Sequence, residues 1–95
     1  MIIVQIEHPV SHFNAWKQAF DNDPVGRERP GVRRYRVLRP IDNPNYAIID
    51  LEFEHSSEAQ TFLAAMREVW SHVVGTIIES PPQVRIVEVV ENKEC

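Results

Sequence analysis

Residues 57–73, SEAQTFLAAMREVWSHV, are the most strongly patterned stretch of the chain. Apolar side chains recur there at intervals of three and four residues: Ala59, Phe62, Leu63, Met66, Val69, Trp70 and Val73. This period predicts a helix with one apolar face. Ser57 and Gln60 have the spacing of a capping box at its start, and Gly75 follows its end, where a left-handed residue often closes a helix. Such a helix needs an apolar surface to lie on, and the rest of the chain supplies a sheet.

Four other segments predict strands, because their side chains alternate in polarity or are rich in Val and Ile. These segments are residues 2–8, 32–39, 46–54 and 83–91. In the third of them, one face is continuously apolar and consists of Ala47, Ile49, Leu51 and Phe53. The turn formers of residues 41–45 predict a hairpin between the second and third strands.

A shorter helix is predicted over residues 11–21. Ser11 is its expected N-cap, and Phe13, Trp16 and Phe20 have the spacing of a buried stripe. Residues 25–31 and 77–82 are predicted to be irregular connections, because glycine or proline interrupts them.

The resulting order is strand, helix, strand, strand, helix, strand, which predicts a ferredoxin-like α+β fold. We expect a four-stranded antiparallel sheet in the order 4-1-3-2, with both helices on one face. Residues 1–95 should form this single domain, since the length suits one small domain.

Composition narrows the function classes. Apolar residues make up 43% of the chain and charged residues 25%, which is ordinary for a soluble globular protein. No apolar run approaches the ~20 residues of a membrane span, and the start lacks the pattern of a signal peptide. Cys95 has no partner for an internal disulfide. We therefore expect a cytoplasmic protein without membrane association.

The charge distribution is uneven. Six of the ten basic residues lie in residues 27–39, and all six are arginines, whereas the net charge of the chain is −4. A nucleic-acid-binding protein would carry a broad basic face, so no nucleic-acid partner is expected. Arginine suits carboxylates and other anions, and the cluster leaves room for such contacts.

The second face of the predicted sheet carries a mixture of side chains. Ile3, Tyr46, Ile48 and one side of residues 83–91 are apolar, and a monomer rarely exposes so much apolar surface. A symmetric homodimer that stacks sheet on sheet would bury it. Polar side chains share this face: Gln5, Glu7, Asp50, Glu52 and either Arg34 with Arg36 or Arg33 with Arg39. We expect a partly polar dimer interface with arginine–carboxylate pairs.

These patterns resemble a known superfamily. The element order, the length, the stretch DPVGRERPGVRRYRVLRPIDNPNYAIIDLEF (residues 23–53) and the helix sequence FLAAMREVW (residues 62–70) are similar to those of dimeric α+β barrel proteins. Within that superfamily the chain resembles antibiotic-biosynthesis-monooxygenase-like domains and small bacterial relatives, and the resemblance covers nearly the whole chain. Oxygenases of this superfamily tend to carry a tryptophan on the second helix, which Trp70 matches.

The candidate site residues each have a structural alternative. Trp70 is either a core residue or the wall of a pocket between helices and sheet that stacks on a planar ligand. Catalytic roles are also conceivable for His12 and His72, as acid or base, and for Tyr35 if its side chain faces the helices. The aromatic and sulfur side chains that could line the pocket, or only pack in the core, are Phe13, Trp16, Phe20, Phe62 and Met66.

The hypothesis for function follows from this set. We expect a small homodimeric protein that binds a small apolar or aromatic molecule and, if it is an enzyme, acts as a cofactor-free monooxygenase, cyclase or isomerase. The alternative is a non-catalytic binding or interaction module. No metal site is expected, because His8 and His12 lie on either side of Pro9 and not on one helix face. No cofactor is expected either.

Overall fold

The computed structural model describes residues 1–22, 31–73 and 81–95. Its elements follow the predicted order: β1 (Ile2–Pro9), α1 (Phe13–Asp21), β2 (Arg34–Leu38), β3 (Tyr46–Phe53), α2 (Ser56–Val73) and β4 (Gln83–Glu88). None of the helices within the described residues is long and apolar enough to cross a membrane. The predicted connections 25–31 and 77–82 and the closing residue Gly75 fall largely or wholly outside the described residues.

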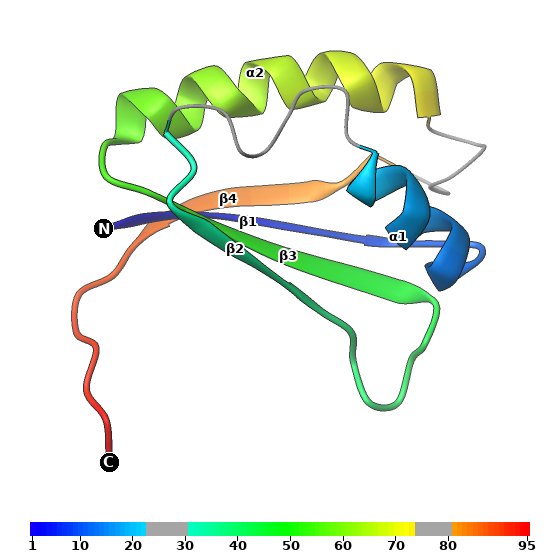
Figure 1. Cartoon of the computed structure of the whole chain (residues 1–95), viewed down its shortest axis with the longest axis horizontal. Coiled ribbons are helices and arrows are strands. Elements are labelled where there is room, and N and C mark those ends of the chain that lie inside the picture. Colours follow the sequence, from blue (N-terminus) through cyan, green and yellow to red (C-terminus); the bar gives the residue numbers. More distant parts are fainter. Residues whose placement is uncertain (23–30, 74–80) are drawn as a thin grey trace.

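The four strands form one antiparallel sheet in the order β2-β3-β1-β4. This is the expected ferredoxin-like arrangement, so the predicted fold class and strand order are confirmed. Both helices cover the same face of the sheet, and α2 runs along it while α1 sits near one end (Figure 1). The opposite face, which we call the open face, is not covered by α1 or α2.

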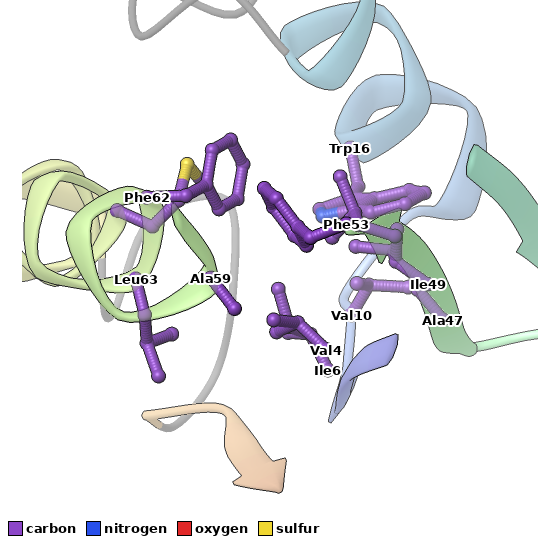
Figure 2. Close-up of a cluster of buried hydrophobic side chains, with 12 residues drawn as sticks. Val4, Ile6, Val10, Trp16, Ala47, Ile49, Phe53, Ala59, Phe62 and Leu63 are labelled. Carbon is purple, nitrogen blue, oxygen red and sulfur yellow. The ribbon is translucent and has the colours of Figure 1, made fainter. Parts of the chain in front are cut away.

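The core lies between the sheet and the helices. Alternate residues of the two central strands face it, and Val4, Ile6 and Leu51 are at most 1% exposed. From α2, Ala59, Phe62, Leu63 and Met66 pack down onto these strands, as the helical period predicted (Figure 2). Burying each large side chain contributes roughly 1.5–3 kcal/mol, so this layer supplies most of the driving force for folding.

The helix starts differ from the sequence prediction. The second helix begins at Ser56, and His55 precedes it as the N-cap. The backbone N–H of His55 donates to Glu58 Oε1 at 3.1 Å, so Glu58 takes the capping role that we had predicted for Gln60. The first helix begins at Phe13 with His12, and not Ser11, as its N-cap. Both shifts are local, because the apolar faces already fix how each helix lies.

The edge strands are shorter than predicted. The last strand pairs only through Glu88, and one further hydrogen bond joins the Val89 N–H to the Met1 carbonyl at 2.9 Å. Pairing ends there because β1 itself begins at Ile2 and offers no further partner. Residues 89–95 then leave the sheet on the side away from the helices (Figure 1).

Candidate functional site

The first helix brings four predicted site residues together. Trp16 is buried and stacks on Phe20, with ring centroids 5.3 Å apart and planes 25° apart. Phe13 contacts Trp16 at 5.5 Å, and Phe20 meets the Tyr35 ring edge-on at 5.6 Å. Tyr35 therefore faces the helices, as the alternation of β2 requires. These rings pack on one another as a continuous cluster, the arrangement that the core interpretation predicts.

His8 belongs to this cluster, although sequence reasoning did not select it. Its side chain is 2% exposed and meets the Trp16 ring edge-on at 5.6 Å. Burial lowers the pKa of His8 from its usual value, against a smaller opposing contribution from a hydrogen bond with the Pro9 carbonyl, so the imidazole is neutral at neutral pH. The alternation of Val4, Ile6 and His8 along β1 is the signal that could have placed it among the apolar residues.

Unlike His8, the two histidines predicted as catalytic candidates lie at the surface. His12, at the N-cap of α1, and His72, in the last turn of α2, are both exposed. Within the described residues, no group of three or more His, Cys, Asp or Glu side chains could hold a metal ion.

Phe62 and Met66 lie in the core beneath α2. Phe62 packs against Phe53 with ring centroids 5.5 Å apart, and Met66 is buried in the same layer (Figure 2). The Phe62 side chain points away from the helix toward Phe53 of β3 (Figure 2), and Met66 belongs to the same buried cluster, so the contacts of both side chains in the described structure are packing contacts.

Trp70 lies beside an open groove. The groove has a volume of about 380 Å³ and runs between the last turns of α2 and the beginning of β4, which lie at the same end of the molecule (Figure 1). Its described lining residues are Arg67, Trp70, Ser71, Pro81, Pro82 and Val84. Trp70 is half-buried, with part of its ring against the core. The groove therefore offers a flat aromatic surface, two proline rings and one guanidinium.

The structure thus separates the predicted pocket residues. None of Phe13, Trp16, Phe20, Phe62, Met66, Tyr35, His12 and His72 is among the described residues that line the Trp70 groove. Arg67 and the two prolines, which sequence reasoning did not select, take their place. Arg67 could have been found from its spacing, because it lies one helical turn before Trp70 and shares its side of α2.

Charged side chains of the open face pair within the chain. Arg34 meets Glu52 at 3.1 Å, and both Nε and Nη2 of Arg36 donate to Asp50 Oδ2 at 3.2 and 3.1 Å. Each pair joins directly opposed residues of β2 and β3. We had expected the arginines to pair across a dimer interface, but the register of the sheet places carboxylates beside them. Of the two pairs of arginines considered from the sequence, the open face carries Arg34 and Arg36.

The same face carries two further polar contacts. The Tyr46 hydroxyl donates to Glu7 at 2.8 Å, and this hydrogen bond, with smaller contributions from burial and the charge of Glu7, raises the pKa of Tyr46. Arg85 Nε donates to Gln5 Oε1 at 3.1 Å. Asp50 Oδ1 is buried and has no hydrogen-bond partner within the described part of the chain. A hollow of about 630 Å³ lies over this face, and Val89, Glu91 and Asn92, which follow β4, form part of its border.

Solved structures share this fold over nearly the full chain. A proposed antibiotic biosynthesis monooxygenase from Nitrosomonas europaea has a TM-score of 0.74 at 19% identity, with 96% of this chain and 100% of that one covered. Another from Deinococcus radiodurans has a TM-score of 0.79 at 16% identity, with 100% and 98% covered. SnoaB, a cofactor-independent oxygenase from Streptomyces nogalater, has a TM-score of 0.77 at 12% identity, with 96% and 94% covered.

The sequence itself matches no protein-family model and no curated protein. The structural likenesses therefore establish the fold, which is the ferredoxin-like α+β fold of antibiotic biosynthesis monooxygenase domain proteins. The resemblance seen in the sequence is confirmed at this level.

Proposed function

We propose that the protein binds a small, flat, largely apolar molecule in the Trp70 groove. The observation that carries this proposal is the half-buried Trp70 ring beside a groove of about 380 Å³. That volume lies in the range of small-molecule sites, which are mostly apolar with a few polar groups. A planar ligand would stack on the indole and contact the rings of Pro81 and Pro82 opposite.

The groove favours binding over catalysis. Its described lining residues include no His, Asp, Glu, Tyr or Cys, so they offer no acid or base that titrates near neutral pH. A cofactor-free oxygenase, of the kind that SnoaB is, remains the catalytic candidate because the fold is shared. In that case proton transfer would involve a group outside these lining residues, such as His72 or Tyr35.

We also propose that two chains associate through the open face. Ile3, Ile48 and Val87 project from it between the polar pairs. Stacking two such faces would bury these apolar side chains, and it would bring new donors toward Asp50 Oδ1. Arg34 and Arg36 already pair with carboxylates within each chain, so these two arginines would enter the interface with their charges paired.

Replacement of Trp70 tests the binding proposal. The variant Trp70→Leu keeps an apolar side chain against the core but removes the aromatic plane. With 2-naphthamide as a neutral two-ring probe, we expect calorimetric titration to show at least a tenfold weaker affinity than in the unmodified protein, because stacking on an aromatic ring is lost. Circular dichroism should show an intact fold.

The matched control is Phe62→Leu, which changes an aromatic residue of the same helix that lies in the core. It should lower thermal stability and leave the probe affinity within about twofold. Two results would contradict the proposal. One is an equal probe affinity of Trp70→Leu and the unmodified protein. The other is no binding of the probe to the unmodified protein at a concentration of about 1 mM, which is on the order of the dissociation constant of a weak small-molecule complex.

A further inference from the structure

Arg67 differs from the other arginines that the structure describes. Three of them pair with carboxylates: Arg33 with Glu54 at 2.9 Å, and Arg34 and Arg36 with acids of β3. Arg85 donates a hydrogen bond to Gln5. The Arg39 guanidinium lies 4.6 Å from the centre of the Phe13 ring. Arg67 makes no hydrogen bond, ion pair or ring contact with any described residue. It is instead one of the residues that line the Trp70 groove.

The helix cannot supply a counter-charge for Arg67. The residues three and four positions away, which are its neighbours on the helix surface, are Leu63, Ala64, Trp70 and Ser71. None of them is acidic. The Ser71 hydroxyl donates to the Glu68 carbonyl at 2.7 Å, so it is already held by its own helix.

The other described walls of the groove also lack an anion. Pro81, Pro82 and Val84 carry no charge, and no carboxylate belongs to the described lining. Arg67 is exposed at the edge of this mostly apolar groove, and its guanidinium offers a planar fork of hydrogen-bond donors. That fork matches a carboxylate, which accepts two parallel hydrogen bonds from it.

We infer that the Trp70 groove selects flat aromatic carboxylates of one or two rings, with Arg67 holding the acid group. This inference rests on the proposed function, because it names the chemical class of ligand for the same groove. Trp70 contributes the surface on which the ring stacks, and Arg67 lies one turn earlier on α2, at the edge where the acid group would emerge. The groove volume of about 380 Å³ fits a one- or two-ring acid.

A matched pair of probes tests the inference. 2-Naphthoate and 2-naphthamide have the same rings and nearly the same size, and they differ in charge. In calorimetric titrations of the full chain we expect the unmodified protein to bind the acid about tenfold or more tightly than the amide, the ratio expected from a hydrogen bond between charged groups. Raising the salt concentration should reduce this ratio, because the interaction is near the surface.

The variant Arg67→Gln should remove the preference for the acid and leave the affinity for the amide within about twofold. Lys93→Gln is the charge-matched control, since Lys93 lies in the exposed C-terminal tail, and it should keep the preference. Arg67→Lys should retain only part of it, because the charge stays but the planar fork is lost.

Two results would overturn the inference: equal binding of acid and amide by the unmodified protein, or an unchanged preference in Arg67→Gln. In either case, amide binding that still depends on Trp70 would leave the proposed function standing. If neither probe binds the unmodified protein, the proposed function fails together with the inference.

Discussion

His8 is a titratable group inside an apolar cluster, and its position has a consequence for stability. Burial lowers the pKa of His8 in the folded protein below its value of 6.5 in an unfolded chain. Below pH 6.5 the unfolded chain takes up a proton that the folded protein resists. The unfolded state then binds more protons, so the free energy of unfolding falls as the pH is lowered from 7 toward 5. The contribution is fully present above pH 6.5.

Urea unfolding at a series of pH values measures this effect. His8→Leu should flatten the dependence between pH 5 and 7, because the titrating ring is gone and an apolar side chain takes its place. The exposed His12 provides the control, and His12→Gln should keep the slope of the unmodified protein. A slope that persists in His8→Leu would assign the effect to other groups.

Single residues also mark the limit of prediction from sequence. The alternation of β1 was sufficient to show which side chains face the helices, His8 included. The burial of His8 depends on its contact with Trp16 of α1. No pattern within the sequence of β1 predicts that contact. Trp70 presents a different case: its helical spacing left a core residue and a pocket wall as alternatives, and the groove beside it also depends on Pro81 and Pro82, which lie outside α2.

At the level of the elements, the start of α2 is held by Glu58. Its carboxylate accepts the His55 N–H and lies in the first turn, where a negative charge interacts favourably with the helix dipole. We expect Glu58→Ala to lower the free energy of unfolding by about 1 kcal/mol, as the loss of a helix cap does. Gln60→Ala tests the spacing predicted from sequence, and it should change stability by less than about 0.5 kcal/mol. Equal effects of the two variants in thermal unfolding would contradict this assignment.

The sequence predicted the type and the order of the helices and strands well. It predicted less well the residues at which they begin and end. Apolar periodicity decides whether a segment is a helix or a strand, and that signal is spread over many residues of α2 and β3. An end depends on one or two hydrogen bonds. The pairing of β4 stops where β1 begins, which is a property of its neighbour and not of its own Val-rich sequence.

As a whole, the molecule consists of two layers. Figure 1 shows these layers edge-on, with both helices on one side of the sheet. Among the described residues, the helices cover only one side of the sheet. Apolar side chains on both sides of central strands are typical of sheets that are buried on both faces, and Ile3 and Ile48 on the open face fit that description. A second chain is the simplest covering layer that the sequence itself supplies.

Association through the open face can be tested by placing a charge at its centre. Light scattering of the unmodified protein at micromolar concentration should give about twice the chain mass of 11.0 kDa. Ile3→Lys puts an ammonium group between two stacked sheets, and the cost of removing this charge from water should shift the mass to that of one chain. Ala64→Lys adds the same charge on an exposed position of α2 and should leave the dimer intact. A monomeric unmodified protein, or a dimer that persists in Ile3→Lys, would show that the open face does not bind a second chain.

The Trp70 groove lies on the helix side of the sheet, so Ile3→Lys should still bind 2-naphthamide, which separates the dimer proposal from the binding proposal.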